Sequence, residues 1–474
     1  MNVEKTIKGF VVAATKSNSG KTTVTLGILA ALIKRGIKVA PFKVGPDFID
    51  PGHHGHIAKA ISRNLDGWML SPQYNRATFS KGCEKSELAV VEGVMGLFDG
   101  YDGQSEAGST AEMAKWLNLP VLLVVDARSM ARSAAALLQG FENFDDDLRF
   151  AGVIFNQVGS PRHLDYLSQA IKGHVNLDCL GGIPRDGQIS IPERHLGLHT
   201  AYDHPLDDRR IDALAAMIED NIDLDKLLNS LPNGPLPFSE TKIASLPSNQ
   251  NVRIGVAKDK AFCFYYQDNL DLLAAAGAEI VPFSPLTDSC LPDNLDGLYL
   301  GGGYPELYAE TLSQNQGLNA QIKQAATGDM PIYGECGGFM YLGQSIQDKN
   351  GRQHPMAGIF PFKFKMLNKL KSLGYREITL ANDTILGKSG SVMRGHEFHY
   401  SEITGPNDSE TVSLPTAYKV TTRAGLDKTP QGYQFKRCLG SYLHLHFGSN
   451  PDIAKTFITS CRRYKKIRSK KPGF

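Results

Sequence analysis

Two short stretches of this 474-residue chain hold residue types and spacings that could do chemistry. The first, TKSNSGKTT at residues 15–23, places a lysine directly after a glycine, as phosphate-binding loops do. The second, GECGG at residues 334–338, flanks a cysteine with glycines, which suits an exposed nucleophilic thiol. Near the end of the chain, His444-Leu445-His446 offers imidazole bases. These stretches predict a nucleotide site and a Cys–His site in one protein.

The phosphate loop lies between an apolar run and a helical pattern, so it would form the turn that opens a helix. Free backbone N–H groups and the helix dipole favour phosphate there. Gly20 lets the backbone approach the ligand, Lys21 would reach the β- and γ-phosphates, and the Thr22 hydroxyl would coordinate Mg²⁺. Thr15 stands where such loops usually begin with glycine. The predicted ATP-binding residues of this loop are Thr15, Lys16, Ser19, Gly20, Lys21, Thr22 and Thr23.

Acidic residues near strand ends could complete the metal site, because Mg²⁺ beside a triphosphate needs hard oxygen ligands. Asp47 follows the second expected strand, and Glu92 ends the apolar run LAVVE at the position of a Walker B acid. Ligands bind at the carboxyl ends of parallel strands in open α/β sheets. We therefore expect Thr22, Asp47 and Glu92 to hold the metal. Asp99, in GLFDG, is a further acid that we place at the adjoining substrate site.

Lys16 supports a different interpretation of the same loop. The loop resembles those of the partition and septum-positioning switch ATPases, which carry a lysine at this slot. Residues 462–474, RRYKKIRSKKPGF, are rich in Lys and Arg and have no acidic residue, so they could bind nucleic acid in such a cycle. A solvated, frayed terminus is the simpler interpretation of this basic tail.

The cysteine stretch has the pattern of a strand, a sharp turn and a helix, which is the pattern of a nucleophile elbow. The turn would expose the Cys336 thiol at the head of the sheet, and we expect the helix start to lower the thiol pKa. The Gly337 N–H would face a developing oxyanion. Gly302 and Gly303, in LYLGGGYPE, would supply a second donor because their loop also follows a strand.

The thiol also needs a base. His444 and His446 point to one face of the strand SYLHLHF, because strand side chains alternate. One would be the general base and the other its orienting neighbour. A metal-binding role for the pair lacks a third ligand. His396 and His399, in RGHEFHY, form a second pair that we interpret as substrate-contacting or structural.

The elements that position these residues are short apolar runs interleaved with helical patterns, which predict parallel sheets covered on both faces. Strands are expected at 8–15, 37–42, 88–92, 120–125 and 150–156, and helices near 20–35, 110–117, 129–141 and 163–173. A second such series starts at 252, and an antiparallel region is expected at 358–447. We predict an ATP-binding domain at 1–225, a Pro- and Ser-rich linker at 226–250, a thiol domain at 251–461 and the basic tail at 462–474.

Composition sets the broad class. Charge is nearly balanced, with 51 Lys+Arg against 49 Asp+Glu, and 42% of residues are hydrophobic, which excludes a disordered or fibrous chain. No apolar run reaches membrane-spanning length, and the first residues carry no secretory pattern. Seven cysteines without a CxxC argue against a disulfide framework or zinc ribbon. We expect a cytoplasmic enzyme without a membrane or nucleic-acid partner, and we leave a homodimer open.

An ATP site and a Cys–His site in one chain suggest one reaction. The thiol would attack the side-chain amide of glutamine and release ammonia from a thioester intermediate. ATP would activate a carboxylate as an acyl phosphate, which ammonia converts into an amide. The expected activity is therefore a Mg²⁺-, ATP- and glutamine-dependent amidation of a carboxylate.

Many strings along the chain resemble the cobyrinic acid a,c-diamide synthase family of cobalamin biosynthesis: SGKTTVTLG, PFKVGPDFIDPGHH, SRNLDGWML, VEGVMGLFDG, IPERHLGL, FYYQDNLDLL, LGGGYPE, ECGGFMYLG, RGHEFHY and SYLHLHF. The resemblance extends from about residue 8 to 460. It implies an α/β protein in which a P-loop, dethiobiotin-synthetase-like parallel-sheet domain is followed by a class I, triad-type glutamine amidotransferase domain. It also implies amidation of the a and c acetates of cobyrinic acid, with Cys336 as nucleophile, His444 as its activating histidine and Asn156 as an adenine contact.

His446 stands where that amidotransferase class commonly has glutamate, which leaves the third triad member open. Because the implied substrate carries many carboxylates, we expect Lys43 and Arg194 to bind it. The motifs argue against cobyric acid synthase but leave the same diamidation of hydrogenobyrinic acid or Ni-sirohydrochlorin open. A switch ATPase is a more distant alternative, and an inactive relic is disfavoured by the intact Cys336 and His444.

Overall fold

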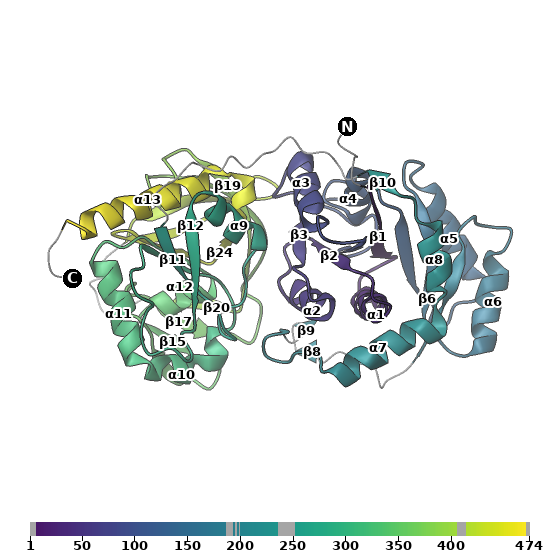
Figure 1. Cartoon of the computed structure of the whole chain (residues 1–474), viewed down its shortest axis with the longest axis horizontal. Helices are drawn as coiled ribbons and strands as arrows, with labels where there is room; N and C mark the ends of the chain where they lie inside the picture. The colour runs from purple at the N-terminus through teal and green to yellow at the C-terminus, as the bar shows by residue number, and fades with distance from the viewer. Residues whose placement is uncertain are drawn as a thin grey trace. The chain divides into compact units, whose positions relative to one another are not determined.

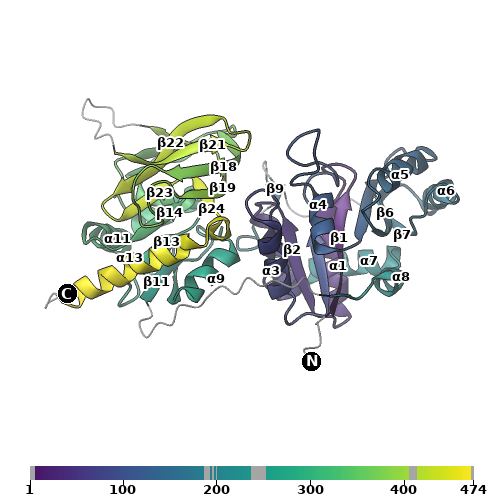
Figure 2. The same ribbon diagram turned by 90° about the horizontal axis from the view of Figure 1, so that it is seen from above.

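The structure, a computed structural model, describes residues 6–185, 193–194, 197–198, 200–235, 252–404 and 414–470. It divides into two compact units, residues 1–242 and 243–474 (Figure 1 and Figure 2). The division falls inside the stretch 226–250 that the sequence predicts as a linker.

The first unit is built on a parallel sheet with strand order β3-β2-β4-β1-β5-β6-β7. Its strands are β1 (Thr6–Ala14), β2 (Val39–Val44), β3 (Arg63–Leu65), β4 (Leu88–Glu92), β5 (Val121–Asp126), β6 (Phe150–Val158) and β7 (Cys179–Pro184). A short strand, β10 (Gly234–Pro235), pairs antiparallel with the start of β1. Outside this sheet, β8 (Glu193–Arg194) pairs with β9 (Gly197–Leu198). The predicted strands are confirmed to within a few residues at each end.

Helices cover both faces of this sheet because its strands are apolar on both sides. Phe10 and Val12 of β1 pack in one hydrophobic cluster, whereas Val11 and Ala13 pack in the other. One face carries α1 (Lys21–Lys34), α2 (Ile49–Ala58), α7 (Asp208–Asn221) and α8 (Leu224–Ser230). The opposite face carries α3 (Pro72–Gly82), α4 (Thr110–Leu117), α5 (Ser133–Asn143) and α6 (Pro161–Ile171). Figure 1 shows α1, α2 and α7 together on one side of the strands and α3 and α4 on the other.

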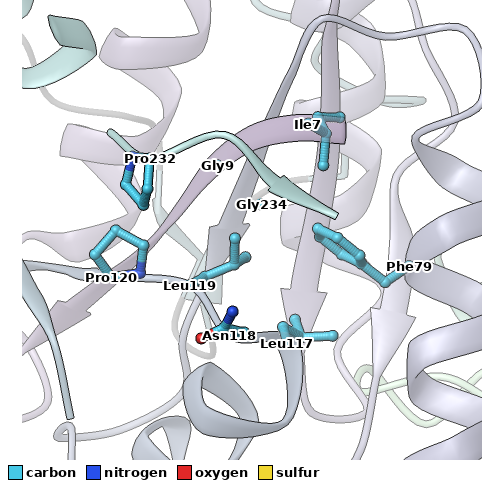
Figure 3. Close-up of a pocket in the computed structure, with 9 residues that line it drawn as sticks. All are labelled: Ile7, Gly9, Phe79, Leu117, Asn118, Leu119, Pro120, Pro232 and Gly234. Carbon is cyan, nitrogen blue, oxygen red and sulfur yellow. The ribbon is translucent and has the colours of Figure 1, made fainter. Parts of the chain in front are cut away.

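The start of the predicted linker is folded into the first unit. Residues 226–230 belong to α8, whose Leu227 is buried, and Gly234 pairs with Ile7 of β1. A small apolar pocket opens here, lined by side chains such as Phe79, Leu119 and Pro232 (Figure 3). It lies where β1 begins, whereas the phosphate loop follows the other end of that strand.

The second unit contains a ten-stranded mixed sheet with order β12-β11-β13-β14-β23-β22-β21-β18-β19-β24. Its parallel part is β12 (Ala278–Phe283), β11 (Val252–Ala257), β13 (Gly297–Leu300), β14 (Ile332–Glu335) and β23 (Cys438–Ser441). Its antiparallel part is β22 (Asp427–Phe435), β21 (Thr416–Thr422), β18 (Ser372–Leu380), β19 (Val392–His399) and β24 (Leu443–Leu445). The predicted antiparallel region is thus confirmed. A smaller sheet joins β16 (Gln353–Pro355), β15 (Ser345–Gln347), β17 (Lys363–Met366) and β20 (Ser401–Thr404).

Helices cover both faces of the large sheet. One hydrophobic cluster contains residues of α9 (Gln267–Ala275) and α13 (Asp452–Arg468). The other contains residues of α10 (Ala309–Gln314), α11 (Gln316–Thr327) and α12 (Gly337–Leu342). Two short 3₁₀ turns, η1 (Pro305–Tyr308) and η2 (Phe447–Ser449), follow β13 and β24. None of the helices in the described part of the chain combines the length and the apolar character that a membrane crossing requires.

The interpretation of residues 462–474 as a frayed tail is wrong for most of its length. Helix α13 continues through Arg468 and packs on the sheet through Cys461. Arg462 donates to the carbonyl of Ala276, and Arg468 bonds the buried Asp296. The long stems of these basic side chains lie along the protein while their charged ends find acceptors.

Candidate active site

The phosphate loop lies between β1 and α1, as predicted. Gly20 has φ 85°, a left-handed conformation that favours glycine. A Cβ built on Gly20 would also lie 2.1 Å from Nδ2 of Asn156, so glycine is required here for space as well. Asn156, two residues before the end of β6, donates to the Ser19 carbonyl at 2.9 Å. The loop start is tied to β5 because the Thr15 N–H donates to Val124. This packing fixes the backbone that would face phosphate.

The two lysines of the loop have different surroundings. Lys16 is exposed, and its Nζ lies 3.9 Å from the Asp126 carboxylate. Lys21 donates to the carbonyl of Met95 at 2.8 Å. Burial and the nearby charge of Lys43 lower the pKa of Lys21 to about 8. Thr23 follows in the first turn of α1. A phosphate at this helix start would restore the full charge of Lys21.

Glu92 is the centre of a buried polar cluster beside the loop. Its Oε1 accepts hydrogen bonds from the Thr22 hydroxyl at 2.6 Å and from Lys43 at 2.8 Å. Its Oε2 lies 2.7 Å from Nε2 of His54, on α2. Burial alone would raise the pKa of Glu92, but the charge of Lys43 and the His54 hydrogen bond hold it well below the usual range. Glu92 is therefore a carboxylate at neutral pH.

Lys43 and Asp47 lie in this cluster in ways that the sequence did not indicate. Lys43, predicted as a substrate contact, is buried and bonds Asp50 at 2.6 Å as well as Glu92. Asp47 caps the start of α2, because its oxygens accept from the N–H groups of Ile49 and Asp50. Burial and the charge of Asp50 raise the pKa of Asp47 above its usual range. Three acids, Asp47, Asp50 and Glu92, thus lie around one lysine.

Of the other two predicted substrate residues, Asp99 lies close enough to Lys21 for its charge to raise the pKa of that lysine. Asp99 is exposed, and its Oδ2 accepts from the Gly96 N–H at 3.0 Å, which closes its own loop. Arg194 belongs to β8, and its side chain lies outside the described part of the structure.

The oxygen atoms at Glu92 fit Mg²⁺ in part. In the described residues, no group of three or more His, Cys, Asp or Glu side chains is arranged to hold a metal ion. The Thr22 hydroxyl and the Glu92 carboxylate are adjacent hard oxygen ligands, which Mg²⁺ accepts when phosphate oxygens and waters supply the remainder. Of the three predicted ligands, the structure brings these two together.

Cys336 forms the predicted elbow between β14 and α12. Its backbone has φ 45° and ψ −102°, a strained conformation for a residue with a side chain. Its N–H donates to Ser441 on β23 at 2.8 Å. Gly338 is required because a Cβ there would lie 2.1 Å from the Leu300 carbonyl. The sequence GECGG thus permits a tight turn that presents the thiol at the carboxyl end of the sheet.

The predicted oxyanion loop lies against both the elbow and the histidine. A Cβ built on Gly337 would be 3.1 Å from the Gly303 nitrogen, so these two backbone segments are in contact. A Cβ built on Gly302 would be 2.3 Å from Cε1 of His444, so that ring packs directly on this glycine. The loop therefore connects the turn that carries the thiol with the imidazole.

The two histidines of the His-x-His stretch have separate neighbours. The His444 ring stacks on His396 of β19 at 4.8 Å. The His446 ring lies 4.6 Å from the Tyr266 ring, and its Nδ1 accepts from the Gly448 N–H. Burial lowers the pKa of His444 to about 3 and that of His446 to about 4. Both rings are neutral at pH 7.

The expectation of a lowered thiol pKa is wrong. Burial raises the pKa of the Cys336 thiol, and the charges of Glu306, Glu335 and Glu397 add to this effect. The Gly337 N–H opposes it but does not compensate. Because α12 is short and the thiol is enclosed, desolvation outweighs the helix start.

Several polar residues of these sites were not predicted from the sequence. They are His54 and Asp50 beside Glu92, and Tyr266, Asn269, Glu335 and Glu397 around the thiol and histidines. All of them lie inside strings that carry the family resemblance, namely PFKVGPDFIDPGHH, FYYQDNLDLL, ECGGFMYLG and RGHEFHY. Their place inside these strings was what could have pointed to them.

Comparison with known proteins gives a match for each unit. Residues 10–198 match the family described as CobQ/CobB/MinD/ParA nucleotide binding domain. Residues 253–452 match the family described as CobB/CobQ-like glutamine amidotransferase domain.

Relatives also match over nearly the whole chain. A protein of Syntrophotalea carbinolica named cobyrinate a,c-diamide synthase is 45% identical over 95% of this chain and 98% of its own length. Proteins of the same name are 44% identical in Dehalococcoides mccartyi, over 94% of this chain and 97% of their own length. A protein of the same name from Caldanaerobacter subterraneus is 41% identical over 96% of this chain and 98% of its own length.

Proposed function

Because the chain belongs to the cobyrinate a,c-diamide synthase family, we propose that it amidates the a and c acetate carboxylates of cobyrinic acid, with ATP and glutamine as co-substrates. It is a glutamine-dependent amidating ligase with a nucleotide-binding unit and an amidotransferase unit. The observation that carries this proposal is the full-length similarity, since both units match and neither half alone would perform the reaction.

In the first unit, ATP would activate the carboxylate. The N–H groups at the start of α1 and the Lys21 ammonium would bind the phosphates, and Asn156 would lie at the adenine side. A substrate carboxylate oxygen would attack the γ-phosphorus, ADP would leave, and an acyl phosphate would form. Thr22 and Glu92, with Asp47 nearby, would hold Mg²⁺, which neutralises phosphate charge when bound. Ammonia would then attack the acyl carbon and expel inorganic phosphate.

In the second unit, Cys336 would supply that ammonia. Its thiol would attack the glutamine amide carbon while His444 takes the thiol proton. The neutral ring of His444 and the raised pKa of the thiol keep the pair uncharged until sulfur bonds to carbon. The N–H groups of Gly303 and Gly337 would stabilise the oxyanion. His444 would return the proton to the amide nitrogen, which would leave as ammonia, and water would then hydrolyse the thioester to glutamate and the free thiol.

The acyl phosphate can be tested with cobyrinic acid labelled with ¹⁸O in its carboxylates. Each amide formed should move one ¹⁸O atom into inorganic phosphate, because the bridging oxygen leaves with phosphorus. Lys21→Ala should form neither amide nor labelled phosphate. Label appearing in AMP, or amide formed without labelled phosphate, would exclude this intermediate.

The macrocycle is tested in the same assay. Hydrogenobyrinic acid and Ni-sirohydrochlorin are offered in parallel, and mass spectrometry counts the amides added to each. Two amides on cobyrinic acid at the highest kcat/KM support the proposal. Two amides formed efficiently on another macrocycle alone would transfer the proposal to that substrate.

A further inference from the structure

Leu445 lies between the two histidines of the His-x-His stretch, and buried side chains bind its main chain. Strand β24 is the last strand of the large sheet and pairs with β19 alone within that sheet. The His446 N–H faces β19 and donates to Arg394. Because backbone groups alternate along a strand, the N–H and C=O of Leu445 face the other way. Two polar side chains meet them there.

Glu335 meets the N–H group. Its Oε1 accepts from the Leu445 N–H at 3.1 Å. Tyr333 donates to the same oxygen at 2.7 Å, and Tyr299 donates to Oε2 at 2.9 Å. Glu335 is 1% exposed and ends the strand that leads directly into Cys336. The carboxylate therefore links the thiol turn to the histidine strand.

Asn269, on α9, meets the carbonyl and the next N–H. Its Nδ2 donates to the Leu445 carbonyl at 2.8 Å, and its Oδ1 accepts from the Phe447 N–H at 2.8 Å. Asn269 is fully buried. One side-chain amide thus holds the main chain on both sides of His446.

Burying these polar groups costs free energy, which suggests that their contacts serve to hold the Leu445 main chain in place. Burying a carboxylate is unfavourable, and desolvation raises the pKa of Glu335 to about 7 despite its three donors. Burial keeps the two tyrosines neutral, so both remain donors. Glu335 and Asn269 together hold the backbone of the strand that carries His444. A general base must be placed within a fraction of an ångström of the group that it deprotonates.

We propose that Glu335 and Asn269 are positioning residues that fix His444 relative to Cys336 through the main chain of Leu445. The inference rests on the proposed role of Cys336 and His444 in releasing ammonia. It also accounts for a histidine standing where related amidotransferases commonly have glutamate, since the main chain rather than a third side chain would orient the base.

The test uses the full-length protein with Glu335→Ala, Asn269→Ala and the conservative Glu335→Gln. We expect kcat with glutamine to fall about 100-fold in the alanine variants, because small misplacements of a base have effects of that size. KM for glutamine and kcat with added ammonia should stay within a factor of three. Glu335→Gln keeps an acceptor for the Leu445 N–H, so its kcat with glutamine should be at least tenfold higher than that of Glu335→Ala.

The rate at which iodoacetamide alkylates Cys336, measured by peptide mass spectrometry, distinguishes a positioning role of Glu335 from an effect of its charge. The charge of Glu335 raises the thiol pKa, so a purely electrostatic role predicts faster alkylation in Glu335→Ala. A positioning role predicts slower alkylation in Glu335→Ala and Asn269→Ala alike. Faster alkylation in the first variant and no change in the second would overturn the proposal.

Asp296→Asn is the matched control for stability. Asp296 is also a buried carboxylate that accepts from a backbone N–H, that of Arg253 at 3.0 Å, but it lies directly before β13. The Asp296→Asn variant should have a lower melting temperature but an unchanged kcat with glutamine. If all variants lose both activities in proportion to melting temperature, Glu335 is merely structural. If Cys336→Ser retains glutamine-dependent amidation, the proposed function itself has failed.

Discussion

Glu397, on β19, is a buried carboxylate whose protonation should be measurable. Its Oε2 accepts from Arg376 at 2.8 Å and from Ser372 at 2.7 Å. Its Oε1 accepts from Gln431 at 2.8 Å and lies 3.2 Å from Nε2 of His399. Burial would raise the pKa of Glu397, but the His399, Ser372 and Gln431 hydrogen bonds outweigh it and lower the pKa to about 2.

The lowered pKa predicts acid sensitivity at this residue. Between about pH 4.5 and pH 2 the unfolded chain binds a proton at Glu397 that the folded chain does not, so the stability it contributes is lost as pH falls. The free energy of unfolding of wild type should decrease across this window by about 3 kcal/mol more than that of Glu397→Gln. Urea titrations of both proteins at several pH values measure the difference. Parallel pH profiles would mean that this carboxylate is not tightly bonded.

Some residues of the cluster around Glu92 could be predicted from the sequence and others could not. Thr22 and Glu92 were predictable because their places in the loop and at the strand end are set by local pattern. His54 was not, since a histidine after Pro51 and Gly52 gives no local sign of a buried contact with another strand. Lys43 was expected to bind substrate because a sequence shows the charge of a lysine but not the carboxylates that already surround it.

Among the secondary-structure elements, the loop after β13 lies against both the Cys336 turn and the His444 ring. Gly302→Ala would place a methyl group 2.3 Å from Cε1 of His444 and force the ring to move. We expect glutamine-dependent amidation to fall at least tenfold while ammonia-dependent amidation is kept. Gly140→Ala is the control, because nothing lies within 4 Å of a Cβ built on this residue of α5 and a helix tolerates alanine. Unchanged glutamine-dependent amidation in Gly302→Ala would show that the reaction does not depend on the present position of the His444 ring.

Helix α13 should stabilise the second unit through Arg468. This side chain donates to the Leu295 carbonyl at 2.6 Å and to Asp296 at 3.0 Å. Arg468→Ala should lower the free energy of unfolding by about 2 kcal/mol, because a buried acceptor loses a charged donor. Arg463→Ala removes the same charge from an exposed position of the helix and should have little effect. Equal effects of the two changes would indicate a general charge effect instead.

The elements themselves were largely predictable, and the exceptions have physical causes. Apolar strands such as β4 and β5 stand out because they are buried on both faces. Helix α2 contains a proline and two glycines, so its sequence IDPGHHGHIA has low helix propensity and its packing on the sheet decides its form. The folded basic stretch of α13 was missed because charge alone does not show which arginines find partners.

At the scale of the whole molecule, the chain combines two complementary chemistries. The first unit has a phosphate loop beside a buried carboxylate, and the second has a thiol on a strained turn and a histidine that packs on the neighbouring glycine loop. Each unit matches a separate family, and relatives with the same combination match over nearly their whole length. We expect the nitrogen released at Cys336 to become the amide formed in the ATP-dependent reaction.

The most direct test follows the nitrogen atom. Wild-type protein with Mg·ATP, cobyrinic acid, glutamine labelled with ¹⁵N in the side-chain amide and unlabelled ammonium should give a product with ¹⁵N in both amides. Cys336→Ser should give the same diamide containing only ¹⁴N, and Lys21→Ala should give none. Incorporation of ¹⁵N by Cys336→Ser, or loss of its amidation with ammonium as well, would mean that Cys336 is not a separate source of the amide nitrogen.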